Sequence, residues 1–351
     1  MLQTPAPRHL LSLADVPAAA LIELVQLSLW FKHQVVSHPT TPPPLATIDR
    51  LRGRTLALLF TKKSTRTRLS AETAWAKLGG AHTVFLGSND IHLGKGESLH
   101  DTAVVLGSMV DALLARVHAH ADLETLAAQM PPHVPVINAL SDRFHPLQAL
   151  ADLATLVEMR GCSPAQRPGA DAFVLPSVDA IAAVFDGLQV AWVGDANNVV
   201  NSLALALPRL GAGVRIATPR GIEMDADVLD RLRHVDAVGG HAGAALRARV
   251  VESHSPQEAV SGADVVVTDT WTSMGHEDGA DEARFAGFTV DADLMAHANP
   301  DAGFLHCLPR KGAEVSDAVF YGPQSWVWTE AQYRQFTKMA VFTWLMGIGR
   351  P

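Results

Sequence analysis

The sequence predicts an α/β protein of two domains, each a mostly parallel β-sheet flanked by helices. From Thr55 onward, short apolar runs alternate with helical patterns, which is typical of parallel strands covered by helices. The length of 351 residues suggests two domains at about 100–200 residues each. The stretch 161–177, with three prolines and two glycines and no periodicity, is expected to be a loop near their boundary. We therefore expect domains at 1–150 and 151–329, joined by crossing helices.

The composition excludes several classes of protein. With 28 Lys+Arg against 36 Asp+Glu, the net charge of −8 argues against a general nucleic-acid binder. The 48% of hydrophobic residues is too high for a disordered chain, and no apolar run reaches the roughly 20 residues of a membrane span. Cys162 and Cys307 are too few for a disulfide scaffold and fit a reducing compartment. Because Arg8 is the only arginine before Arg50, a complete Arg-rich transit peptide is not expected, although a removed one stays an alternative.

In the first half, the sequence predicts an amphipathic helix over 17–33 followed by four β–α units. The run TLALLF at Thr55–Phe60 has the continuous apolar character of a strand buried on both faces. Pro146 suits the first turn of a helix because its missing N–H needs no partner there. The predicted strands are Thr55–Phe60, Thr83–Leu86, Ala112–Arg116 and Pro135–Asn138, and the helices that follow them are Arg66–Leu78, Leu99–Met109, Ala121–Gln129 and Pro146–Met159.

The second half repeats the alternation and ends in a long helix. Its predicted strands are Val190–Val193, Val214–Ala217, Val265–Asp269 and Phe304–Leu308. The segment Val190–Asp195 resembles the first strand and turn of a dinucleotide fold but lacks GxGxxG, so NAD binding is rejected. The last helix is expected over Glu330–Leu345, and the C-terminal segment of about 330–351 is expected to pack back on the first domain.

Hydroxyl and cationic residues follow the first strand, in the stretch 61–68 (TKKSTRTR). A strand that ends in such residues and opens a helix forms an anion site, because free backbone N–H groups and the helix dipole point at the ligand. A solvated basic first turn is the alternative, but four cations there oppose the dipole at about 0.3–1 kcal/mol each unless an anion compensates them. The glycines of a P-loop are missing. We therefore predict a site for a small anion at this helix start.

Polar residues at other element ends are further candidates, each with a simpler reading beside it. Arg116 ends an apolar strand, and ligand sites of α/β proteins lie at strand ends, so it is a candidate site residue. The alternative is an ordinary arginine of an edge strand. His145 caps the next helix or, with Gln148 on the same helix face, converges on one ligand. Of Asn197 and Asn198, we expect one to be an N-cap and the other to face a ligand.

Two residues at the ends of later strands complete the candidates. Asp269 ends a buried strand in a carboxylate, which suits an ammonium group in a partly desolvated site. The adjoining segment 272–275 is either a surface turn or a lid over the site. Cys307 on position alone is a small buried apolar residue.

Taken together, seven ordered motifs resemble the aspartate/ornithine carbamoyltransferase family, over nearly the whole chain. They are Ser64-Thr65-Arg66-Thr67-Arg68, Asp90-Ile91-His92-Leu93-Gly94, Leu114-Ala115-Arg116-Val117, His145-Pro146-Leu147-Gln148, Gly194-Asp195-Ala196-Asn197-Asn198, Asp269-Thr270-Trp271-Thr272-Ser273-Met274-Gly275 and His306-Cys307-Leu308-Pro309-Arg310. The cysteine and the Ser-Met-Gly loop resemble the ornithine-specific members, and the resemblance is to their eukaryotic, fungal or animal-like branch. It implies transfer of the carbamoyl group of carbamoyl phosphate to the δ-amine of L-ornithine, a step of arginine biosynthesis and the urea cycle.

The resemblance also implies a role for individual residues. Those for carbamoyl phosphate are Ser64, Thr65, Arg66, Thr67, His92, Arg116, His145, Gln148, Cys307, Leu308 and Arg334. Those for ornithine are Asn198, Asp269, Ser273, Met274 and Cys307, and the catalytic residues are Arg116, His145, Asp269 and Cys307. His92 is implied to reach the site of a neighbouring subunit in a homotrimer. No metal and no cofactor is implied, and relatives occur in the mitochondrial matrix and in the cytoplasm.

Two departures from the family pattern and two alternatives stay open. The usual Gly-Val-Asn-Glu-Ser is here Gly-Lys-Gly-Glu-Ser at 94–98, and the usual Glu-Ala-Glu-Asn-Arg is Glu-Ala-Gln-Tyr-Arg at 330–334. The first alternative is a carbamoyltransferase for another amine, such as putrescine or a modified ornithine. The second is a catalytically silent relative that regulates a partner enzyme.

Overall fold

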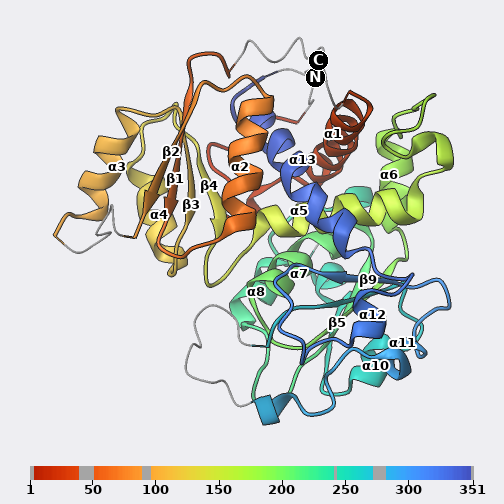
Figure 1. Ribbon diagram of the computed structural model, residues 1–351. Coiled ribbons are helices and arrows are strands. Elements are labelled where there is room, and N and C mark those ends of the chain that lie inside the picture. The colour runs from red at the N-terminus through yellow and green to blue at the C-terminus, as the bar shows by residue number, and fades with distance from the viewer. Residues whose placement is uncertain (1–3, 39–50, 89–95, 241–242, 272–281, 349–351) are drawn as a thin grey trace.

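Two lobes, each built around its own parallel sheet, make up the computed structural model (Figure 1). It describes residues 4–38, 51–88, 96–240, 243–271 and 282–348. The predicted α/β class is confirmed, because all strand pairs of both sheets are parallel and helices flank them. Among the described helices, none combines the length and the apolar character that crossing a bilayer requires.

The first sheet has four strands in the order β2-β1-β3-β4. The central strand β1 (Thr55–Phe60) is buried at five of its six residues, as its continuous apolar run predicts. The other strands are β2 (His82–Gly87), β3 (Ala112–Arg116) and β4 (Val136–Leu140). Their helices are α2 (Thr65–Lys77), α3 (Leu99–Gly107), α4 (His120–Gln129) and α5 (Pro146–Leu156), which continues as a π-helical turn, Val157–Gly161.

The second sheet has five strands in the order β7-β6-β5-β8-β9. The strands are β5 (Gln189–Val193), β6 (Gly213–Ala217), β7 (Val250–Ser253), β8 (Val265–Thr268) and β9 (Gly303–His306). The helices of this lobe are α6 (Val178–Phe185), α7 (Asn198–Leu210), α8 (Ala226–Arg231), α9 (Ala244–Arg247), α10 (Pro256–Val260), α11 (Ala292–Met295) and α12 (Asp317–Phe320). Chain order reverses at β5, so the carboxyl ends of β5 and β8 flank a crevice where ligands of α/β proteins bind.

The two terminal helices meet beside the first sheet. Helix α13 (Val327–Leu345) starts beyond β9 and packs against α1 (Ala18–Ser37), α2 and α5 (Figure 1). The last helix thus lies against helices of the first half of the chain. Most of its side chains are buried, including the charged Glu330, Arg334 and Lys338, which places ionic groups inside the protein.

All eight predicted strands form, six of them with ends shifted by one or two residues, and other differences are more instructive. The sequence reading missed β7 because this edge strand is half exposed and its VVES sequence carries little apolar signal. The strand expected to reach Leu308 ends at His306, because Leu308 has φ 62°, which no strand residue adopts. The predicted 161–177 loop contains one short 3₁₀ turn, Pro164–Gln166.

A buried arginine ties the N-terminal segment to the second lobe. Arg209 of α7 donates to the carbonyl oxygens of Leu13, Val16 and Asp236, at 2.7, 2.6 and 2.8 Å, and also to the Asp236 carboxylate. Asp236 in turn accepts from the backbone N–H of Ala18, the first residue of α1, at 2.9 Å. The arginine thus satisfies three backbone carbonyls that the fold removes from water.

Replacing Arg209 by methionine should lower the free energy of unfolding by about 3 kcal/mol or more, because three carbonyl groups lose their donor. Urea unfolding followed by fluorescence measures it. The matched control is Arg215→Met, since Arg215 donates to a single carbonyl at an exposed site, that of Ser261; its loss should stay below about 1 kcal/mol. Equal losses in the two variants would contradict the structural role given to Arg209.

Candidate active site

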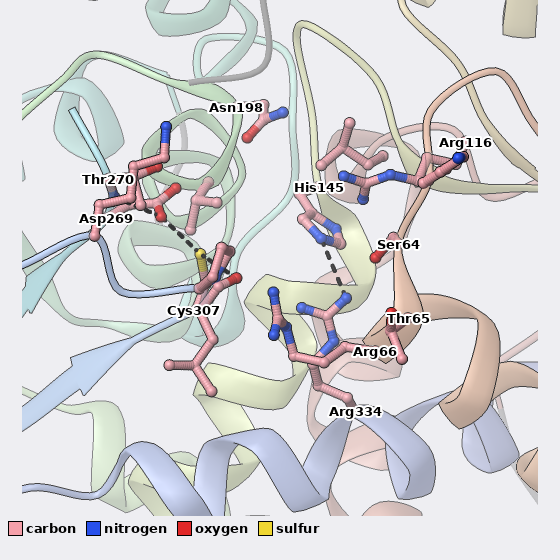
Figure 2. A pocket seen from close by; sticks show the side chains of 16 residues that line it. Ser64, Thr65, Arg66, Arg116, His145, Asn198, Asp269, Thr270, Cys307 and Arg334 are labelled. Carbon is pink, nitrogen blue, oxygen red and sulfur yellow. Dashed lines mark hydrogen bonds between the residues drawn. The ribbon is translucent and has the colours of Figure 1, made fainter. Parts of the chain in front are cut away.

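A cavity of about 440 Å³ lies where the two lobes meet (Figure 2). Its wall combines the loop after β1 with the start of α2, the ends of β3 and β4, the residues just after β8 and β9, the starts of α5 and α7, and one residue of α13. The lining residues are Lys63, Ser64, Thr65, Arg66, Arg116, Leu140, His145, Asn198, Val199, Asp269, Thr270, Cys307, Leu308, Pro309, Lys311 and Arg334. Ten of them are residues to which the sequence assigned a ligand.

The start of α2 forms the anion-binding wall of the cavity. Ser64 is the N-cap, and its Oγ accepts from the backbone N–H of Thr67 at 3.3 Å. The first-turn N–H groups and the side chains of Lys63 and Arg66 are thus presented to the cavity. Arg68 is different: it donates to Glu72 at 3.0 Å and its guanidinium lies 3.9 Å from the Phe85 ring centroid. The expectation that every cation of 61–68 serves the anion is wrong for Arg68, which the helical period turns away.

Two buried guanidinium groups extend this wall. Arg116 is the last residue of β3, and burial, with Arg334 nearby, lowers its pKa to about 9. Arg334 of α13 donates to the Gln148 carbonyl, to Thr67 Oγ1 at 3.1 Å and to His145 Nε2 at 3.4 Å. Two neighbouring buried cations disfavour each other's charged form, so an anion bound between them is strongly stabilised.

The ring of His145 is a neutral hydrogen-bond donor. Burial, together with Arg334, Arg116 and Lys338, lowers the pKa of His145 well below its usual value. Because the nearest polar group to Nε2 is an arginine, which only donates, Nε2 is the acceptor and Nδ1 carries the hydrogen. Nδ1 is buried and has no partner within the described parts of the chain, so its N–H is unsatisfied. His145 sits at the N-cap position of α5, but its side chain caps nothing, so the simple capping reading is wrong.

Gln148 and Thr67 lie behind the cavity wall and do not line it. Both are fully buried, and both hold Arg334, Gln148 through its carbonyl and Thr67 through its hydroxyl. The sequence reading placed them on the ligand. The structure places them one layer back, because the side chain of Arg334 from the last helix occupies the space in front.

A thiol and a carboxylate form the opposite wall. The Cys307 thiol donates to Asp269 Oδ1 at 3.0 Å, and Asp269 also accepts from Asn197 Nδ2 at 2.8 Å and from the Thr270 N–H at 2.7 Å. Burial, and then the charge of Asp269, raises the pKa of Cys307 well above its usual value. The pair is therefore a neutral thiol beside an ionised carboxylate that accepts three hydrogen bonds. A primary ammonium or amine fits this wall, because it adds donors to a carboxylate.

The two asparagines divide as the sequence predicts. Asn197 is the N-cap of α7, and its Oδ1 accepts from the N–H groups of Val199 and Val200 at 2.9 and 3.3 Å. Asn198 lines the cavity and uses one amide hydrogen on the Ser141 carbonyl at 2.6 Å, which leaves the other for a ligand. Asn197 also orients Asp269, which the sequence did not indicate.

The remaining predicted residues divide into two groups. His92, Ser273 and Met274 lie outside the described residues, so their implied roles stay predictions. Leu308 lines the cavity with φ 62°, a left-handed backbone that is rare for leucine and typical of functional sites. Thr270 and Lys311 also line the cavity and were not predicted as site residues; Thr270 lies within a motif and Lys311 follows one, and nothing in their local sequence distinguishes them.

A possible metal-binding cluster proves to be a hydrogen-bonded one. Ligand atoms of Asp269, His306 and Cys307 lie within 4.8 Å of one another. However, His306 Nδ1 accepts from the Leu308 N–H at 2.9 Å, and Nε2 faces Glu314 Oε1 at 3.1 Å. Both ring nitrogens already have partners, so this donor set does not fit a metal ion.

Both halves of the chain are similar to known proteins of one family. The model "Aspartate/ornithine carbamoyltransferase, carbamoyl-P binding domain" matches residues 8–158, and the Asp/Orn binding domain of the same family matches 186–345. The mitochondrial ornithine carbamoyltransferase of Aspergillus terreus is 41% identical over 334 residues, 94% of this chain and 86% of the relative. The mitochondrial ornithine transcarbamylase of Gallus gallus is 43% identical over 84% of this chain and 75% of the relative. The solved structure of ornithine carbamoyltransferase from Pyrococcus furiosus has a TM-score of 0.82 and 39% identity, and the match covers 98% of this chain and 99% of that one.

The thiol of Cys307 should react slowly with iodoacetamide at pH 8, and Asp269→Asn should accelerate it by about threefold or more. Removing the carboxylate charge lowers the thiol pKa and raises the fraction of reactive thiolate. Mass spectrometry of time points in a Cys162→Ser background measures the rate. Asp317→Asn, at an exposed carboxylate, is the control and should change nothing. An unchanged or slower rate in Asp269→Asn would refute the thiol–carboxylate pairing.

Proposed function

The chain belongs to the aspartate/ornithine carbamoyltransferase family, and we propose that it transfers the carbamoyl group of carbamoyl phosphate to the δ-amine of L-ornithine. The products are L-citrulline and phosphate. The observation that carries the proposal is the division of one cavity into two walls. One presents a helix N-terminus and buried guanidinium groups, and the other presents a thiol, a carboxylate and a free amide hydrogen. An acyl phosphate and an amine thus bind face to face.

The cationic wall holds carbamoyl phosphate. The N–H groups and hydroxyls of Ser64 and Thr65, with Arg66, surround the phosphate. Arg116, which lines the same cavity near His145, suits the bridging and carbonyl oxygens (Figure 2). The Nδ1–H of His145 and the guanidinium of Arg116 stabilise the negative charge on the carbonyl oxygen as the carbon becomes tetrahedral. Because these donors are already oriented in the protein, little reorganisation is needed during the reaction.

The opposite wall holds ornithine. The free amide hydrogen of Asn198 suits the α-carboxylate, and Asp269 suits the α-amino group as an acceptor. An alkylammonium has a pKa of roughly 10, so the δ-amine must lose a proton before it attacks. The Asp269–Cys307 pair orients this amine and assists its deprotonation. The implied contacts of Ser273 and Met274 belong to the same wall.

The domain division and the compartment follow as further parts of the proposal. Residues 1–150, together with the last helix, bind carbamoyl phosphate, and residues 151–329 bind ornithine. The family-model limits at 158 and 186 support a boundary in this region. We infer a mitochondrial matrix or cytoplasmic location, and the two mitochondrial relatives above support the former.

The substrate assignment is tested directly by incubating the pure protein with carbamoyl phosphate and one acceptor at a time. Ornithine should give citrulline at a higher kcat/KM than putrescine, N-acetylornithine or aspartate, because Asn198 and Asp269 together match a free α-amino acid head. Preference for any other acceptor would contradict the assignment. No turnover with any of them would indicate the silent relative.

Substitution of the two walls should affect citrulline formation differently. Arg116→Ala should lower kcat/KM by about 100-fold or more, since it removes a charged donor to the developing oxyanion. Cys307→Ala should lower kcat by about 10-fold or more while changing the KM for carbamoyl phosphate little, since the thiol belongs to the amine wall. Thermal unfolding checks that both variants are folded. Full activity in both would show that the chemistry lies elsewhere.

A homotrimer is the assembly that we propose, with His92 reaching a neighbouring site. Among the large apolar side chains that are exposed in the single chain, five belong to the first sheet's edge and its helices: Leu69, Val84, Val104, Val105 and Met109. They lie on α2, on the edge strand β2, on α3 and just beyond it. An apolar surface on an unpaired sheet edge is typical of a protein–protein interface.

Met109→Glu should therefore reduce the assembly from three chains to smaller species, because it buries a charge in the proposed interface. Light scattering after gel filtration measures the mass. Val251→Glu is the matched control, since Val251 is similarly exposed but lies on β7 of the other lobe; it should leave the mass unchanged. A fully active wild-type monomer would contradict both the trimer and the role of His92.

A further inference from the structure

A fully buried amide behind the cavity has a direction that its neighbours dictate. Gln148 Nε2 donates to Asp152 Oδ1 and to Glu330 Oε1, both at 2.7 Å. An amide nitrogen carries two hydrogens, and these two carboxyl groups take both. The carbonyl oxygen of Gln148 therefore faces the other way, toward Arg334, whose guanidinium donates to it.

This direction matters because guanidinium groups only donate. A reversed Gln148 amide would point N–H groups at Arg334 and deprive it of its acceptor on α5. Arg334 would then be left with Thr67 and His145, at 3.1 and 3.4 Å, and its own Nε has no partner among the described residues. The carboxyl pair thus determines where the guanidinium of Arg334 points in the cavity wall.

The two carboxyl groups are not equivalent. Glu330 uses both oxygens as acceptors, since Oε2 accepts from the His306 N–H at 2.9 Å at the end of β9, one residue before Cys307. Asp152 uses only Oδ1 in this way, and its Oδ2 has no partner within the described residues. Glu330 therefore joins α13, α5 and the end of β9, whereas Asp152 has one oxygen to spare.

The charge of the pair fits the same role. Burial raises the pKa of both carboxyl groups, and the charge of Asp152 raises the pKa of Glu330 further. These raised pKa values limit the negative charge that the pair places beside Arg334. Arg66 and Arg116 in the cavity wall keep their positive charge for a dianionic ligand.

We propose that Glu330, supported by Asp152, is a positioning residue for carbamoyl phosphate: it fixes the direction of the Gln148 amide and so aims Arg334 at the ligand. It does not touch the reacting atoms. The inference rests on the proposed function, because it concerns how the same site binds the same substrate.

Glu330→Gln is the decisive variant. Its carbonyl can still accept from His306, but its NH₂ group then meets the NH₂ group of Gln148, and one of the two amides must turn over. We expect the KM for carbamoyl phosphate to rise about 10- to 100-fold, the range of one hydrogen bond to a charged group. The KM for ornithine should change less than about threefold, a split that loss of stability alone does not produce. Calorimetry with inorganic phosphate should show a parallel loss of affinity.

Asp152→Asn and a rescue variant separate positioning from packing. The amide introduced by Asp152→Asn can offer its carbonyl to Gln148 and turn its NH₂ into the place of the partnerless oxygen, so the KM for carbamoyl phosphate should stay within about threefold of wild type. Adding Gln148→Glu to Glu330→Gln places a carboxylate at position 148, which accepts from Arg334. The amide at position 330 on α13 then donates to this carboxylate, and the formal charge of the site is unchanged. We expect the double variant to recover most of the lost affinity.

The control is Glu158→Gln, at another largely buried carboxyl, which bonds Lys32 and Tyr333 and does not contact Arg334. It should lower thermal stability and leave the KM for carbamoyl phosphate unchanged. An unchanged KM in Glu330→Gln, an equal rise in Asp152→Asn, or no recovery in the double variant would each overturn the proposal. If Glu330→Gln does not fold, the double variant and Asp152→Asn decide it. A wild type that makes no citrulline refutes the proposed function instead, and phosphate affinity then still tests the positioning.

Discussion

The guanidinium of Arg334 is held by residues from two distant parts of the chain, the starts of α2 and α5, and the cavity takes its form from that contact. It comes from the last helix and reaches Gln148 on α5, Thr67 on α2 and His145 at the start of α5. It makes His145 Nε2 an acceptor, which leaves Nδ1–H for a ligand. Burial lowers the pKa of Arg116 most, and the charge of Arg334 lowers it further. A bound anion therefore relieves the repulsion between Arg116 and Arg334. The packing of α13 against α1, α2 and α5 is what brings this arginine to the site.

The opposite wall follows the reverse electrostatic logic. Asp269 keeps three donors around one carboxylate, and burial together with the charge of Asp269 keeps Cys307 protonated. Excess positive charge on one wall and a negative charge on the other allow one cavity to bind a dianion beside an amine. The net charge of −8 is compatible with this site because the relevant cations are concentrated in a small buried volume.

Local pattern predicted the strands other than β7, since apolar runs are properties of neighbouring residues, and the motifs that resemble the family implied most of the lining residues. Contacts between distant residues were not predictable in this way. Gln148 and Arg334 are 186 residues apart, so the sequence placed both on the ligand and did not show that one stands behind the other. Arg68 was misplaced because the position of a cation in a motif does not give the side of the helix that it occupies. The half-exposed edge strand β7 lacked the apolar signal by which the other strands were found.

A crystal structure grown with inorganic phosphate tests most directly whether Arg334 completes an anion site built on the start of α2. The account predicts phosphate within hydrogen-bond distance of the N–H groups at Ser64–Arg66 and of the Arg116 guanidinium, with Arg334 still bonded to the Gln148 carbonyl and to Thr67. Phosphate bound away from the start of α2, or an Arg334 side chain turned away from Gln148, would contradict it.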